Sequence, residues 1–122
     1  MFKVIVAGSR GFTDYDLLVS KLDKILQDKT DVEIVSGGAK GADSMGEAYA
    51  ESKGYKLTVF PADWNKYGKS AGYKRNVQMA DYADVLVAFW DGQSKGTSHM
   101  IDIMREKDKP VRVIRFQEDS VD

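Results

Sequence analysis

The stretch Val4-Ile5-Val6-Ala7-Gly8-Ser9-Arg10-Gly11 decides the fold class, because a short β-branched apolar run ends here in a glycine-rich turn. Such a run is typical of a buried strand. A helical pattern follows over residues 16–26, with four apolar side chains on one face: Leu18, Leu22, Ile25 and Leu26. The chain therefore begins with a strand, a polar turn and a helix, the unit from which α/β proteins are built.

The same alternation continues along the rest of the chain. Apolar strands are expected at residues 32–36, 55–60, 85–90 and 111–114, helices at 44–53, 72–82 and 98–107, and a loop over 62–70. Strands that are apolar on both faces and alternate with helices predict a parallel sheet covered on both sides. We therefore predict one domain over residues 1–122, an α/β Rossmann-like three-layer sandwich with about five parallel strands. The acidic tail, residues 117–122, is expected to fray.

The composition excludes several classes of protein. The chain has no cysteine and one histidine, His99, so a thiol nucleophile and a Cys-ligated zinc site are excluded, and we expect neither a metal nor a cofactor. No stretch is long enough to span a membrane and no signal peptide is evident, so we expect a cytoplasmic protein without membrane contact. Eighteen Lys and Arg residues nearly balance nineteen Asp and Glu residues, which argues against nucleic acid as a partner.

Three turns that follow predicted strands carry most of the candidate ligand-binding residues. Each combines glycine with a cation or a small polar residue: Gly8, Ser9 and Arg10; then Gly37, Gly38, Lys40 and Gly41; then Gly96 and Thr97, beside Lys95. Glycine lets an anion approach the backbone, and N–H groups of the following helix point at it. Since ligands bind at the carboxyl ends of parallel strands, the three turns predict an anion pocket. For any single turn, a plain tight turn remains the alternative.

Other candidates lie on the intervening segments. Trp64 begins a stretch of aromatic and basic residues, and its ring either stacks on a base or anchors a loop. Arg75 and Asn76 open a predicted helix at the same end of the sheet, where we expect them to contact the ligand. Asp43 lies in the first turn of its helix and either complements the helix dipole or accepts a hydrogen bond from a ribose hydroxyl.

The segments Val6–Arg10, Ser36–Asp43, Pro61–Trp64, Arg75–Asn76 and Gly96–Met100 together resemble the YspA/YpsA-related branch of the SLOG superfamily. The resemblance covers nearly the whole chain in the right order. It implies a Rossmann-like domain that binds nucleotides or nucleotide-derived ligands and assembles as a homo-oligomer, a dimer or larger. Relatives in that superfamily include the LOG phosphoribohydrolases, the DNA-processing DprA proteins and sensor domains for ADP-ribose-type signals.

One departure from the LOG enzymes bears on activity. Those enzymes pair an arginine in an R-K-x-x-M stretch with a glutamate in P-G-G-x-G-T-x-x-E. Residues 75–79 are similar to the first motif, whereas Met100 stands in place of the glutamate. Because stabilisation of the ribose cation needs a carboxylate or a base, this departure argues against catalysis.

We therefore predict a protein that senses, carries or sequesters a phosphate-bearing nucleotide or nucleotide-derived small molecule, such as an ADP-ribose-type signal. The alternative is a LOG-like hydrolase of nucleoside 5′-monophosphates in which Asp91 or Asp102 replaces the glutamate. Binding of single-stranded DNA, as in DprA proteins, is a third hypothesis that the balanced charge disfavours.

Overall fold

Five parallel strands form a single sheet in the computed structural model, which describes residues 1–117. All four strand pairings are parallel, and the strand order is β3-β2-β1-β4-β5. The strands are β1 (Phe2–Gly8), β2 (Val32–Ser36), β3 (Lys56–Val59), β4 (Val85–Trp90) and β5 (Val111–Arg115). The predicted α/β Rossmann-like fold is thereby confirmed. Apart from Gln117, the tail expected to fray lies outside the described residues.

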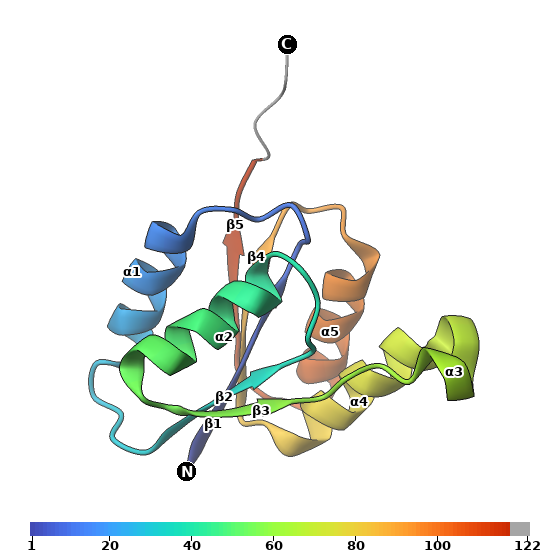
Figure 1. The fold of residues 1–122 in the computed structure, drawn as a ribbon, viewed down its shortest axis with the longest axis horizontal. Helices are drawn as coiled ribbons and strands as arrows, with labels where there is room; N and C mark the ends of the chain where they lie inside the picture. Colours follow the sequence, from blue (N-terminus) through green and yellow to red (C-terminus); the bar gives the residue numbers. More distant parts are fainter. Residues whose placement is uncertain (118–122) are drawn as a thin grey trace.

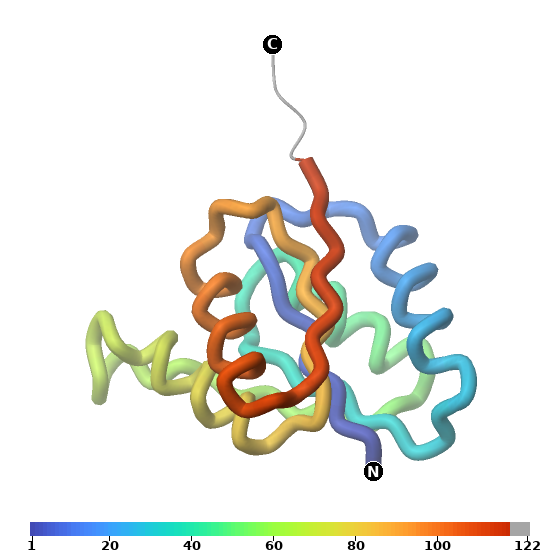
Figure 2. Tube along the Cα trace, turned by 180° about the vertical axis from the view of Figure 1, so that it is seen from behind, coloured from blue at the N-terminus to red at the C-terminus, as the bar shows by residue number. Residues whose placement is uncertain are grey.

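Helices cover both faces of the sheet and produce three layers (Figures 1 and 2). Successive residues of a strand point to opposite faces. Val4 and Val6 pack against α1 (Tyr15–Leu26) and α2 (Ala42–Lys53), whereas Ile5 and Ala7 pack against α4 (Ala71–Tyr82) and α5 (Lys95–Glu106). This division explains why a central strand of a two-sided sheet is a continuous apolar run.

Two helices begin two or three residues before the position that their apolar patterns predict. The sequence predicts helix starts at residues 44 and 98, but α2 begins at Ala42 and α5 at Lys95. The expected loop over 62–70 is also wrong, because it contains α3 (Trp64–Tyr67) and a 3₁₀ turn (Gly68–Ser70). Asp63 caps α3 by accepting a hydrogen bond from the Lys66 backbone N–H at 3.1 Å, a local signal that apolar periodicity does not report.

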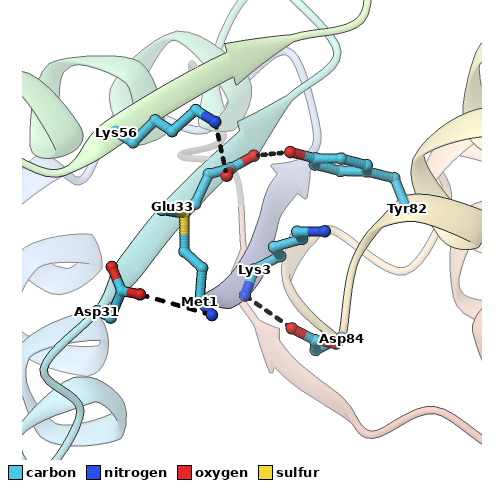
Figure 3. Close-up of polar contacts among 7 residues, drawn as sticks. All are labelled: Met1, Lys3, Asp31, Glu33, Lys56, Tyr82 and Asp84. Atoms are coloured by element: carbon cyan, nitrogen blue, oxygen red, sulfur yellow. Dashed lines mark hydrogen bonds and ion pairs between the residues drawn. The ribbon is translucent and has the colours of Figure 1, made fainter.

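The prediction of strands that are apolar on both faces is wrong at Glu33, which is fully buried in β2. Figure 3 shows the Tyr82 hydroxyl donating to Glu33 Oε2, and the Lys56 ammonium lies 3.4 Å from Oε1 without the geometry of a hydrogen bond. Burial opposes ionisation of Glu33 most strongly, but hydrogen bonds from Tyr82 and Thr58 and the charge of Lys56 together lower its pKa. Edge strand β3 and α4 thus supply the partners that make a buried carboxylate tolerable.

Within residues 1–117, no helix combines the length and the apolar character needed to cross a bilayer. The same residues bring no three His, Cys, Asp or Glu side chains together in an arrangement that could hold a metal ion.

Candidate functional site

A cavity of about 570 Å³ opens at the carboxyl end of the sheet, where the turns after β1 and β4 run beside each other at the top of Figure 1. The chain leaves β1 toward β2 on one side, while β4 lies on the other, so the strand order reverses at this point. Ligand sites of open α/β sheets lie at such a reversal, and this volume suits a small molecule.

Most of the predicted site residues line this cavity: Gly8, Ser9, Arg10, Asp43, Trp64, Arg75, Asn76, Gly96 and Thr97. The exceptions all belong to the turn after β2: Gly37, Gly38, Lys40 and Gly41. From that turn only Ala39 reaches the cavity, while Gly38 and Lys40 are exposed. The structure therefore brings two of the three predicted turns together in the wall of the cavity, whereas the third contributes only Ala39 to that wall.

Gly41 shows what the turn after β2 does instead. Its φ is +76°, and a Cβ there would lie 2.4 Å from the Ser9 carbonyl oxygen and 2.5 Å from that of Arg10. The Ala42 N–H donates to Ser9 O at 3.4 Å. Gly41 therefore lets the start of α2 pack against the turn after β1, and its role is to allow close backbone approach.

Arg75 and Asp43 meet at Gly37. Arg75 Nη1 donates to the Gly37 carbonyl oxygen, and Asp43 Oδ2 accepts from the Gly37 N–H at 3.1 Å. Burial raises the pKa of Asp43 to about 6, although the Arg75 charge and the backbone N–H groups of Ala39 and Gly37 oppose that rise. A carboxylate with a raised pKa beside a guanidinium in a cavity is typical of a functional site.

Asp43→Asn should make the protein more stable at pH 7 to 8. Because the pKa of Asp43 rises from 3.8 to about 6 on folding, folding takes up a proton between these values. The stabilising contribution of the protonated form is complete below about pH 4, declines as the pH rises through 6, and is then absent. The variant should gain on the order of 2–3 kcal/mol above pH 6 and show a flatter stability profile between pH 4 and 6.

Urea denaturation at several pH values checks this expectation, with Asp28→Asn, an exposed position, as the control. An Asp43→Asn variant less stable than the parent at pH 7 would contradict it.

Asn76 ties α4 to the first turn of α5. Its Nδ2 donates to the Gly96 carbonyl oxygen and to His99 Nδ1, each at 3.2 Å, while its Oδ1 accepts from Arg75 Nε at 3.1 Å. Burial lowers the pKa of His99, which favours the neutral ring whose Nδ1 can accept this hydrogen bond. Both ends of the buried Asn76 amide are therefore engaged, and this side chain positions Arg75 as well as lining the cavity.

The first turn of α5 lines the cavity, and its backbone N–H groups have no acceptor in the helix. The side chain of the N-cap residue, Ser94, accepts no hydrogen bond from the backbone N–H groups of this turn; its Oγ accepts instead from Thr97 Oγ1 at 3.4 Å. Gly96 and Thr97, expected in a loop, lie in this first turn. Such a helix terminus attracts anions through its free N–H groups and its dipole.

Asp91 is the second carboxylate of the cavity. Its Oδ1 accepts hydrogen bonds from the backbone N–H groups of Gln93 and Ser94, both at 2.8 Å. These hydrogen bonds lower the pKa of Asp91. Met100, at the position of the LOG glutamate, also lines the cavity and is 1% exposed, whereas Asp102 is exposed and does not line it.

Several lining residues were absent from the predicted site: Gly11, Ala39, Lys69, Gly72, Tyr73, Met79, Asp91, Gln93, Ser94 and Met100. Helical spacing could have found Gly72 and Met79, because they lie three or four residues from Arg75 and Asn76 on one face of α4. Lys69 follows the unexpected helix α3, so its position depends on a segment whose structure the pattern did not predict.

Comparisons with known proteins agree with this architecture. Residues 2–67 match the family described as "YspA, cpYpsA-related SLOG family". The Gene 61 protein of Mycobacterium phage D29 is 36% identical over an alignment of 124 positions, which covers 95% of this chain and 97% of the phage protein.

Solved structures show the same fold. DNA processing protein A (DprA) of Streptococcus pneumoniae superposes on 96% of this chain with a TM-score of 0.77 and 22% identity. The match spans only 51% of DprA, so this chain corresponds to about half of that protein. A protein designated TM1055 superposes on 91% of this chain, and on 72% of its own length, with a TM-score of 0.67 and 21% identity.

Proposed function

Because the chain belongs to the YspA, cpYpsA-related SLOG family, we propose that it binds a phosphate-bearing, nucleotide-derived small molecule in the cavity at the carboxyl end of the sheet. The protein acts as a sensor, carrier or sequestering agent for a ligand such as an ADP-ribose-type signal. One observation carries the proposal: the uncapped first turn of α5 and the Arg75 guanidinium line the same cavity.

The lining supports a division of the ligand between two kinds of surface. Free N–H groups of α5 and the fork of Arg75 suit a phosphate, which accepts several charge-assisted hydrogen bonds. At the rim, the residues Trp64 and Tyr73 are 56% and 47% exposed, which suits them to contact a planar base. The Tyr73 ring also packs edge to face on the His99 ring, with 4.5 Å between the centroids. Ligand stacking would explain why two large aromatic side chains remain exposed beside a cavity.

Isothermal titration calorimetry with AMP and ADP-ribose tests the binding, and chromatography of the incubated nucleotides tests catalysis. We expect saturable binding without release of free base. Hydrolysis needs a group that stabilises positive charge on the ribose, and the thioether of Met100 cannot ionise. Arg112→Ala, at an exposed position on β5, should bind both nucleotides like the parent and serves as the control.

Base release at an enzyme-like rate, abolished by Asp91→Asn, would contradict the binding function and establish the alternative, hydrolysis of nucleoside 5′-monophosphates. Asp91 is the carboxylate to test, because it lines the cavity and Asp102 does not. The homo-oligomer and the cytoplasmic location expected from the sequence stay predictions, which sedimentation and fractionation can check.

A further inference from the structure

Asp43 is a buried carboxyl group in the wall of the main cavity. It is 5% exposed, and its Oδ2 accepts the hydrogen bond from the Gly37 N–H. A Cβ on Gly37 would lie 2.7 Å from Arg75 Nη1 and 2.9 Å from Asp43 Oδ2, so the guanidinium and the carboxyl group approach the same point of the backbone. Within residues 1–117, however, Asp43 forms no direct ion pair with any cation. The charge of Arg75 therefore acts on Asp43 through space and not through a direct contact.

Charged groups surround Asp43 on α2, on α4 and on the turns after β1 and β2. Burial is the main cause of its raised pKa; Arg75 of α4 opposes the rise, and Glu47, one turn further along α2, adds to it. On the turn after β1, Arg10 lies close enough to Arg75 for its like charge to lower the pKa of Arg75, although burial lowers it more. Lys40, on the turn after β2, is exposed, where solvent screens its charge. The ionised form of Asp43 thus depends on Arg75.

The charges of the main cavity leave little room for an anion. Among the described residues, the side chains of this cavity that are charged near neutral pH are Arg10, Lys69, Arg75, Asp43 and Asp91. Three cations and two carboxylates leave a surplus of one positive charge, whereas a pyrophosphate diester carries one negative charge on each phosphate. Backbone N–H groups lower the pKa of Asp91, which therefore stays ionised. Protonation of Asp43 would make the occupied cavity neutral.

We propose that Asp43 takes up a proton when a phosphate of the ligand binds beside Arg75, so that the affinity for the ligand falls as the solution becomes more alkaline. This inference rests on the proposed function, because the phosphate must occupy the main cavity. An anion there shares the positive charge of Arg75 that favours the ionised form of Asp43, and its own charge repels that form. The protonated carboxyl group avoids both costs, and its O–H can donate a hydrogen bond.

The sign of the pH dependence follows from the free protein. The pKa of Asp43 is about 6 before the ligand binds, and a nearby anion should raise it further. At pH 5 the carboxyl group is largely protonated with or without ligand, so binding takes up almost no proton. Between pH 6 and 8 the complex keeps the proton that the free protein loses. One linked proton changes the affinity by at most about tenfold per pH unit, so we expect a fall of roughly 5- to 25-fold over this range.

Titration calorimetry with ADP-ribose at pH 5, 6, 7 and 8 tests the proposal. Both phosphates of ADP-ribose are esterified and do not titrate in this range, whereas the phosphate of AMP has a pKa of about 6 of its own. Titrations at pH 7 in two phosphate-free buffers of different ionisation enthalpy give the number of protons taken up. We expect about half a proton or more per ligand for the parent. Asp43→Asn should take up none and bind equally well at pH 6 and 8.

Asp91→Asn is the matched control, because it removes the other carboxylate of the same cavity. Its affinity for ADP-ribose should differ from that of the parent by a similar factor at every pH, and the proton uptake should remain. Loss of the uptake in this variant would assign it to the net charge of the cavity and would contradict the proposal.

The parent protein alone gives a decisive result. Binding of ADP-ribose without proton uptake at pH 7 would overturn the inference and leave the proposed function intact. Uptake that persists in Asp43→Asn would assign the proton to another group, such as His99, and would also overturn it. If ADP-ribose does not bind the parent at any of these pH values, the proposed function itself fails, and the inference fails with it.

Discussion

Gly41→Ala should destabilise the protein by roughly 2–6 kcal/mol, because backbone strain and a steric clash act at the same position. Gly41 has a φ of +76°, which costs any other residue strain, and the added methyl group would lie 2.4 Å from a backbone oxygen of Ser9. A backbone carbonyl cannot change its rotamer as a side chain can. To relieve the contact, the start of α2 must therefore move away from the turn after β1. We expect the midpoint of thermal unfolding to fall by about 10 °C or more.

Gly54→Ala is the matched control for this substitution. Gly54 shares the positive φ, +72°, but its ψ of 23° lies in the αL region, whereas the ψ of Gly41 is −124°. A Cβ on Gly54 meets no atom of residues 1–117 within 4 Å. Only the strain of the left-handed conformation applies, so the loss should be about 1–2 kcal/mol. If scanning calorimetry gives equal losses for the two variants, neither the close packing of α2 on the turn after β1 nor the ψ of Gly41 is what requires this glycine.

The strands of the sheet could be predicted because the residues that identify each strand lie within that strand or directly after it. A buried central strand such as β1 is apolar on both faces and ends at glycine, and nothing outside the segment is needed to recognise it. Glu33 shows the limit of this reasoning. Its burial in β2 depends on contacts with Tyr82 of α4 and Lys56 of β3. The residues of β2 alone do not predict these contacts.

Site residues at the carboxyl end of a strand could be predicted, because the strand itself places them beside the cavity. Gly8 ends β1 and Ser9 follows it, and both line the cavity, as do residues that follow β4. The turn after β2 was harder, because glycines that contact a ligand and glycines that contact backbone have the same sequence signature. Gly41 belongs to the second kind, and only the packing of α2 on Ser9 and Arg10 reveals this.

Arg75→Ala should weaken binding of AMP by about 10- to 150-fold, since a hydrogen bond to a charged group contributes about 1.5–3 kcal/mol. Arg75 also donates to the Gly37 carbonyl oxygen and lies near the buried Asp43. We therefore expect an additional loss of stability of about 1 kcal/mol or more.

A double variant separates the two roles of Arg75. In the Arg75→Ala protein, Asp43 loses the nearby positive charge that opposes the rise in its pKa, so its ionised form becomes more costly. Asp43→Asn removes that cost, and the variant Arg75→Ala/Asp43→Asn should recover stability at pH 7 without recovering affinity for AMP. Urea denaturation and titration calorimetry on the parent, Arg75→Ala, Asp43→Asn and the double variant complete this double-mutant cycle. Recovery of affinity together with stability would mean that Arg75 serves only to neutralise Asp43, and the phosphate would then depend on the first turn of α5 alone.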